Sequence, residues 1–68
     1  MRSKNRLTLR SARMMRGITQ AKMAELLGIH LNTYVNWEQK PDNISIRNAE
    51  KICSILEMQT DDIIFLEK

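Results

Sequence analysis

Apolar residues recur along the chain at the spacing of an α-helix. Positions three, four and seven apart share one face of a helix, whereas a half-buried strand alternates apolar and polar residues. The spacing predicts five short helices, near residues 9–16, 20–27, 31–39, 46–56 and 61–65. No segment alternates as a strand would, and no repeat or linker interrupts the chain. The pattern therefore predicts an all-α domain.

Residues typical of helix ends separate these segments. Side chains that suit N-caps precede three of the predicted helices, at Thr19, Ser45 and Thr60. Gly17 and Gly28 stand where a helix commonly ends in a left-handed residue. Pro41 cannot continue a helix and disfavours helical angles at Lys40, so residues 40–43 are expected to form a turn.

The apolar faces of the predicted helices define a candidate core. Its members are Leu9, Ala12, Met23, Ala24, Leu27, Tyr34, Trp37, Ile46, Ala49, Ile52, Cys53, Leu56, Ile63, Ile64 and Phe65. Leu7 or Met15 extends the first face, and we expect Met14 and Met15 to fill gaps beside it. Cys53 lies within an apolar stripe, which favours packing over redox chemistry.

Length and composition exclude several classes of function. A chain of 68 residues holds one small domain. One cysteine excludes an internal disulfide and a cysteine-based zinc site, and His30 has no second histidine beside which to bind a metal. Two glycines cannot form a phosphate-binding loop, and no catalytic set is present, so we expect no enzyme, cofactor or metal. No apolar run approaches the roughly 18 residues of a membrane span, which favours an intracellular protein.

Charge is distributed unevenly along the chain. Residues 1–22 carry seven bases and no acid, whereas residues 23–68 carry four bases and eight acids. A polyanion would therefore meet the amino-terminal end, although solvated basic side chains give the same pattern. We expect residues 1–8 to form a basic arm that becomes ordered on DNA, or a solvated tail, and residues 9–66 to form the domain.

The most specific feature is the pair of short helices joined at Gly28. Two helices that cross steeply need a small residue at the crossing, which Ala24 provides. The tight turn needs a residue tolerant of left-handed angles, followed by an apolar plug at Ile29. Tyr34 and Trp37 then anchor the second helix. A generic helical hairpin would not need all these residues together.

These residues resemble the helix-turn-helix of phage Cro and lambda-repressor-type domains, often called Xre-type regulators. The resemblance spans residues 9–66 and rests on Thr19-Gln20-x-x-x-Ala24-x-x-Leu27-Gly28-Ile29, Thr33-Tyr34-x-x-Trp37-Glu38, Leu9-x-x-x-Arg13-x-x-x-Gly17-Ile18-Thr19-Gln20 and Asp61-Asp62-Ile63-Ile64-Phe65. It implies a compact five-helix, lambda-repressor-like DNA-binding domain in which the second and third helices form the reading unit.

The resemblance also implies roles for individual residues. The base-contacting face of the recognition helix matches Leu31, Asn32, Thr33 and Asn36. Gln20 matches a residue that holds a phosphate, and Thr19 lies close to that phosphate. Apart from the resemblance, phosphate contacts are also expected from the nitrogen-bearing side chains of His30, Lys40 and Arg10. Arg13 and Glu38 match a structural ion pair that ties the first helix to the end of the third. His30 stands where the family commonly has Ser or Thr, so it either caps or touches a phosphate or is simply a turn residue.

The chemistry of the predicted base-contacting face also supports DNA binding. Asparagine offers a donor and an acceptor that match adenine in the major groove, and Leu31 can pack on a thymine methyl. The face therefore favours sites that contain A·T pairs. Lys22 is the only Arg or Lys between Gln20 and Lys40, so this helix has no obvious group to read guanine.

The sequence thus predicts a stand-alone, sequence-specific regulator that binds double-stranded DNA, as a repressor of phage or prophage type in a bacterial or phage-infected cell. Because one short helix reads few base pairs, a homodimer on DNA is expected, through the fifth helix or the carboxyl-terminal residues. No small-molecule ligand and no membrane partner are expected. The alternative is a protein-interaction module, such as an antitoxin or anti-repressor, that uses Leu31 and Tyr34 as contacts.

Overall fold

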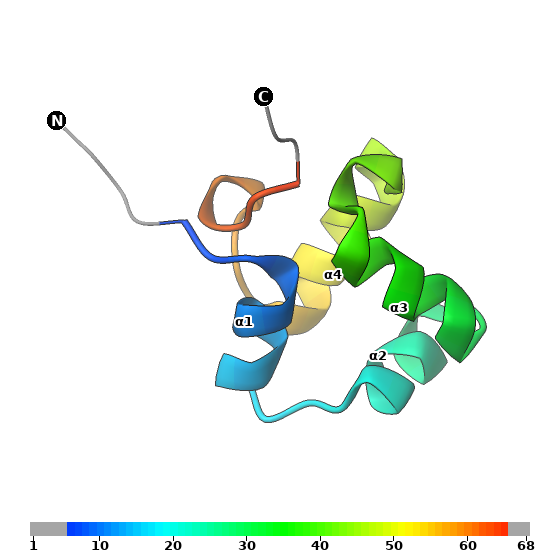
Figure 1. Ribbon diagram of the computed structural model, residues 1–68. Coiled ribbons are helices and arrows are strands. Elements are labelled where there is room, and N and C mark those ends of the chain that lie inside the picture. Colours follow the sequence, from blue (N-terminus) through cyan, green and yellow to red (C-terminus); the bar gives the residue numbers. More distant parts are fainter. Residues whose placement is uncertain (1–5, 66–68) are drawn as a thin grey trace, which may run out of the picture.

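The computed structural model describes residues 6–65 as an all-α domain (Figure 1). These residues form four α-helices: α1 (Leu9–Met15), α2 (Gln20–Leu27), α3 (Leu31–Gln39) and α4 (Ile46–Leu56). Two single 3₁₀ turns, η1 (Pro41–Asn43) and η2 (Thr60–Asp62), follow α3 and α4. The predicted all-α class is confirmed, and so are the predicted extents of α2, α3 and α4.

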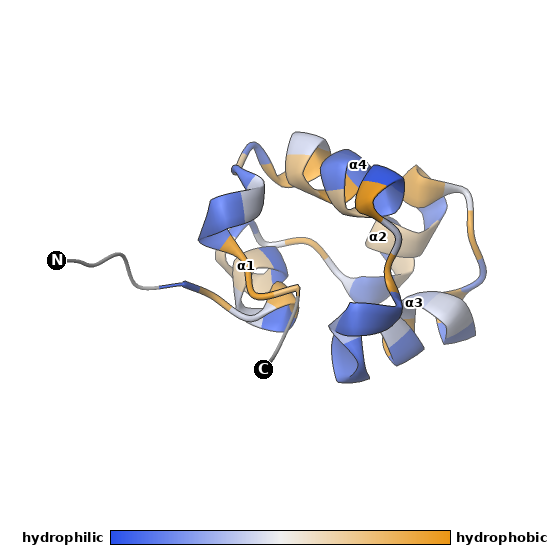
Figure 2. Ribbon diagram, turned by 90° about the horizontal axis from the view of Figure 1, so that it is seen from above, coloured by the Kyte–Doolittle hydropathy of each residue, from blue (hydrophilic) through white to orange (hydrophobic). Residues whose placement is uncertain are grey.

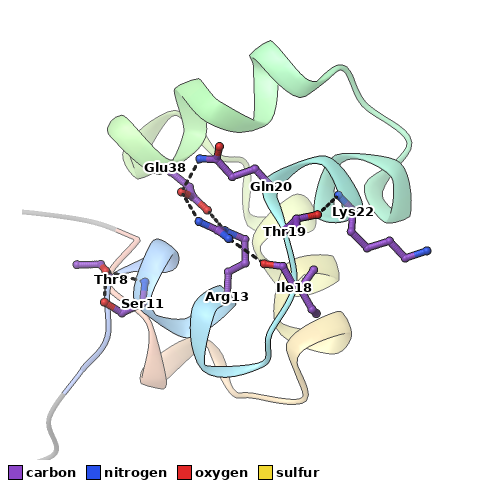
Figure 3. A network of polar contacts seen from close by, with 8 residues as sticks. All are labelled: Thr8, Ser11, Arg13, Ile18, Thr19, Gln20, Lys22 and Glu38. Carbon is purple, nitrogen blue, oxygen red and sulfur yellow. Dashed lines mark hydrogen bonds and ion pairs between the residues drawn. The ribbon is translucent and has the colours of Figure 1, made fainter.

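Three helices begin at a side-chain N-cap. The hydroxyl oxygens of Thr8, Thr19 and Ser45 each accept a hydrogen bond from the backbone N–H three residues further on, at 3.1, 3.0 and 3.2 Å. The first two caps are drawn in Figure 3. Each bond satisfies a backbone donor that the helix leaves free. The caps at Thr19 and Ser45 confirm the sequence prediction, whereas the cap at Thr8 is an addition to it.

Three residues near helix ends have a left-handed backbone. Gly17 and Gly28 have φ angles of 69° and 72°, as expected for residues that follow a helix. Glu57, at the end of α4, has a φ angle of 56° although it carries a side chain. Such a conformation is unfavourable for a residue with a Cβ atom, so the surrounding structure must impose it on Glu57.

The expected fifth helix is replaced by the single turn η2 and an extended end. Gln59, and not Thr60, occupies the N-cap position of η2, and its backbone N–H donates to Asp62 Oδ2 at 3.0 Å. Beyond η2 the chain pairs with the residues before α1. Ile64 donates its N–H to the Leu7 carbonyl at 2.8 Å, and Ile63 forms a parallel bridge with Leu7. This pairing takes the backbone groups that a further helical turn would need.

The same pairing extends the domain toward the amino terminus. Leu7 N–H donates to the Asp62 carbonyl at 2.9 Å, and an Arg6 guanidinium N–H donates to the Ile63 carbonyl at 3.2 Å. Residues 6–8, assigned to the basic arm from the sequence, are therefore bound to the domain. The rest of the expected arm, including Arg2 and Lys4, lies outside the described residues.

The core is formed by one side of each helix, while the other side is mostly hydrophilic with a few exposed apolar residues (Figure 2). Its buried members are Leu9, Ala12, Met23, Ala24, Leu27, Tyr34, Ala49, Ile52, Cys53, Leu56 and Ile63. Trp37 and Phe65 are half-buried and pack against this cluster. Burial also raises the pKa of the Cys53 thiol, in keeping with a packing role. No helix within residues 6–65 is both long enough and apolar enough to span a membrane.

Three apolar residues assigned to the core from the sequence are exposed instead. Met14 and Met15 are 57% and 63% exposed, because Leu9, Ala12 and Arg13 already occupy the inward face of α1. Ile46 is 80% exposed at the first position of α4, one turn before the buried face of that helix begins at Ala49. These three predictions are wrong.

Candidate nucleic-acid interface

Helices α2 and α3 form a tight helix-turn-helix, with the turn at Gly28 (Figure 1). Gly28 donates its N–H to the Glu25 carbonyl at 3.1 Å, and Ile29 donates to the Ala24 carbonyl at 3.0 Å. These two bonds close the end of α2, while the half-buried Ile29 packs against the core. The geometry of the turn is therefore determined by residues within five positions of one another.

Helix α3 has an anchored face and an exposed face. Tyr34 is fully buried and Trp37 is half-buried against the core. On the exposed face lie Asn32, Asn36 and Leu31, the last 46% exposed, while the fourth predicted reading residue, Thr33, is half-buried. Within the described part of the chain, no residue bonds to the side-chain amides of the two asparagines. Both amides are thus available to a partner outside the domain.

A buried ion pair holds α3 against α1 (Figure 3). Arg13 donates through Nε to Glu38 Oε2 at 2.6 Å and through Nη2 to Oε1 at 3.4 Å. The two side chains are only 9% and 5% exposed. Arg13 Nη1 also donates to the Ile18 carbonyl at 2.8 Å, so the guanidinium fixes the segment that leads into α2. The structure thus brings together the two residues of the expected ion pair.

Gln20 connects α2 to the same pair. Its Nε2 atom donates to Glu38 Oε1 at 3.0 Å, so the first residue of α2 is joined to the last turn of α3. Burial acts to raise the pKa of the Glu38 carboxyl, but the hydrogen bonds from Arg13 and Gln20 outweigh burial and hold the pKa below its ordinary value. Glu38 is therefore a carboxylate that links three helices.

The residues expected to contact phosphate lie at several places. Gln20 is the first residue of α2 and Thr19 is its exposed N-cap. His30 and Lys40 are exposed at the two ends of α3, and no hydrogen bond from the His30 side chain caps that helix. Arg10 is exposed on α1, a different element. Four of the five thus border the helix-turn-helix.

Two basic residues have roles that the sequence analysis missed. Arg16 Nε donates to the Leu56 carbonyl at 2.6 Å, and its Nη2 donates to the Glu57 carbonyl at 3.3 Å. These bonds satisfy carbonyls that the end of α4 leaves free. Arg6 bonds the Ile63 carbonyl in a similar way. The amino-terminal charge therefore also stabilises the fold, and no local sequence signal shows it, because the partners lie at least 40 residues away.

The fold and the exposed face of α3 define a helix-turn-helix domain. The family model described as helix-turn-helix matches residues 9–63, which is most of the chain. The chain therefore belongs to the Cro/C1-type, Xre-like helix-turn-helix family, a family of DNA-binding regulatory domains and not of enzymes. Comparison with curated proteins and with solved structures gave no match.

Proposed function

We propose that the chain is a sequence-specific transcriptional regulator, a repressor of phage or prophage type, and that α3 reads the major groove of double-stranded DNA. One observation carries this proposal: α3 is anchored on one face and presents Asn32, Asn36 and Leu31 on the other. A recognition helix needs this arrangement, because its reading side chains must be free while its backbone is fixed. The exposed chemistry favours A·T pairs.

The hydrogen bond from Gln20 to Glu38 gives Gln20 a specific role in this function. A side-chain amide nitrogen carries two hydrogens, and one of them is directed at the Glu38 carboxylate. The second hydrogen remains for a phosphate oxygen at the start of α2. Thr19, His30, Lys40 and Arg10 supply further phosphate contacts, which position the domain without reading sequence.

We also propose that two copies act together on DNA. A single α3 of nine residues reaches only a few base pairs, so useful specificity requires two neighbouring half-sites. Two-fold symmetry in the protein then corresponds to a palindromic operator.

The alternative function, a protein-interaction module, has less support from the structure than from the sequence alone. It uses Leu31 and Tyr34 as contacts, but Tyr34 is fully buried. Leu31 alone remains, and a single exposed leucine is ordinary on a protein surface.

Selection of bound sequences from a random pool of DNA duplexes tests the proposed function. We expect enrichment of one class of A·T-containing sites, with an affinity that falls steeply as salt rises, by about 0.9 in log K per decade of salt for each phosphate neutralised. Recovery of no preferred sequence, or binding that salt leaves unchanged, would contradict the proposal.

A further inference from the structure

Helix α3 carries two stripes of different chemistry away from its anchored face. Leu31 and Val35 are four residues apart, and so are Asn32 and Asn36, so each pair lies along one line of the helix surface. The two lines are offset by one residue, which is about 100° around the helix. An apolar stripe and an amide stripe therefore run side by side along α3.

Val35 is the less expected member of the apolar stripe. Its side chain is half-buried, but it is not among the described half-buried apolar residues that pack against the core cluster. Tyr34 and Trp37 make the contacts of α3 with that cluster. A β-branched residue also has a lower helix propensity than alanine or most long polar residues. Neither core packing nor helix formation therefore accounts for a valine at this position.

Leu31 extends the stripe to the first residue of α3, where it is 46% exposed. A single exposed leucine is ordinary, but Leu31 continues the line of Val35, so the two form one apolar surface. Both residues lie in the first five positions of α3, and the amino-terminal residues of a recognition helix are those that contact base edges. The stiff side chain of Val35 also loses little rotamer freedom in such a contact.

The two stripes match the two halves of an A·T pair in the major groove. Adenine presents the N7 acceptor and the N6 amino donor, which suit an asparagine amide. Thymine presents an O4 acceptor and a C5 methyl group, and only the methyl group suits an apolar side chain. Uracil and cytosine lack this methyl group, whereas 5-methylcytosine carries it at the same ring position. An apolar stripe can therefore read a pyrimidine by the presence of its methyl group.

We propose that Leu31 and Val35 form a methyl stripe, which recognises the C5 methyl group of a pyrimidine, so that the domain distinguishes thymine from uracil and 5-methylcytosine from cytosine. The inference rests on the proposed function, because it requires α3 to lie in the major groove. It adds Val35 to the base-contacting residues and assigns part of the specificity to apolar contact. Methylation of a cytosine at such a position then strengthens binding without a change of base sequence.

Replacement of each thymine of the selected site by deoxyuridine tests the methyl stripe. Deoxyuridine keeps every hydrogen-bonding group of thymidine and lacks only the C5 methyl group. We expect one or two of these replacements to weaken wild-type binding by about fourfold each, the value for burial of one methyl-sized apolar group. At each of these positions, Val35→Ala or Leu31→Ala should bind the thymine and deoxyuridine duplexes equally.

A second set of duplexes carries cytosine or 5-methylcytosine at the same positions. The wild type should bind the methylated duplex about fourfold more tightly than the unmethylated one. The variant that ignores the thymine methyl group at a position should ignore this one too. The two sets distinguish the two sources of the methyl group, and equal binding of the cytosine and 5-methylcytosine duplexes would overturn recognition of the modified base.

Two control variants separate methyl recognition from a general loss of binding. Asn36→Ala shortens the amide stripe, so it should lower the affinity for both duplexes of a pair and leave their ratio unchanged. Leu26→Ala is the matched apolar control and should keep the wild-type ratio, since Leu26 is 48% exposed but lies on α2. Circular dichroism should show that all four variants fold as the wild type does.

The outcomes separate this inference from the proposed function. A wild-type domain that binds its selected site but treats thymine and deoxyuridine alike at every position would overturn the methyl stripe alone. Discrimination that persists in both Val35→Ala and Leu31→Ala would also overturn it, because the methyl group would then act through the shape of the DNA. Failure to select any preferred sequence would contradict the proposed function and this inference together.

Discussion

The helix-turn-helix and the carboxyl-terminal part of the domain, residues 56–65, differ in the sequence distance that their contacts span. The turn at Gly28 is closed by bonds between residues no more than five positions apart. The end of α4 is closed by Arg16, 40 residues before Leu56, and Ile63 is bonded by Arg6, 57 residues before it. The turn of the helix-turn-helix is therefore encoded locally, whereas the end of α4 and the segment after it depend on the assembled fold.

The ion pair between Arg13 and Glu38 is where we expect the largest effect on stability. Glu38→Ala leaves a nearly buried guanidinium unpaired, which should lower the free energy of unfolding by about 3 kcal/mol. Glu25→Ala is the matched control, because its ion pair with Lys22 spans 3.6 Å with both side chains mostly exposed, and its loss should change stability by less than about 0.5 kcal/mol. Urea unfolding measures both. Equal midpoints for the two variants would show that the pair does not hold α3 to α1.

The same pair gives a pH dependence of stability. The folded state holds the pKa of Glu38 below its ordinary value of 4.5, so the pair contributes stability above that pH. This contribution is lost as the pH falls through the folded pKa. Unfolding free energies of the wild type and of Glu38→Gln should therefore converge as the pH is lowered below about 4.5. A difference that stays constant over this range would contradict the assignment.

Substitutions of Gly28 test the turn of the helix-turn-helix, the part of the domain that is encoded locally. A Cβ atom built at this position meets nothing within 4 Å, so Gly28→Ala should cost only the left-handed backbone conformation, about 1–2 kcal/mol. Gly28→Asn should cost less, because asparagine tolerates that conformation better. Thermal unfolding of the wild type and the two variants gives the order of their stabilities. A neutral alanine variant would mean that the turn relaxes to another geometry.

Glu57 tests the carboxyl-terminal part of the domain, and here we expect a substitution to raise stability instead of lowering it. Glu57 has a φ angle of 56°, which glycine adopts without strain, so Glu57→Gly should stabilise the domain by about 0.5–1 kcal/mol. The bond from Arg16 to the backbone carbonyl at this position does not need the Glu57 side chain. A lower melting temperature for this variant would show that the side chain itself stabilises the end of α4.

The same contrast explains which features the sequence predicts. Local signals agree with the fold at Thr19, Gly28 and Ser45, so α2, α3 and the start of α4 are predicted correctly. The expected fifth helix fails because its backbone pairs with Leu7, which no local pattern reveals. The prediction that Ile46 is buried is wrong because hydrophobicity alone does not show whether another element covers a residue.

The candidate site likewise combines features that local sequence predicts with features that depend on distant residues. The exposed face of α3 is predictable, because helical spacing separates Asn32 and Asn36 from the anchors Tyr34 and Trp37. The bonds of Arg6 and Arg16 to backbone carbonyls are not predictable, because their partners come together only when the chain folds.

The most direct test of the account compares specific and non-specific DNA affinity for Asn32→Ala and Asn36→Ala at one salt concentration. Both residues are exposed, so folding should be unchanged, and Asn48→Ala on α4 is the control. If each asparagine makes a bidentate base contact, its loss should weaken binding to the selected site by about 1–3 kcal/mol. Binding to random duplex should stay nearly unchanged, because phosphate contacts carry no sequence information. Equal losses on both DNAs, or no loss on the selected site, would show that α3 is not the reading helix.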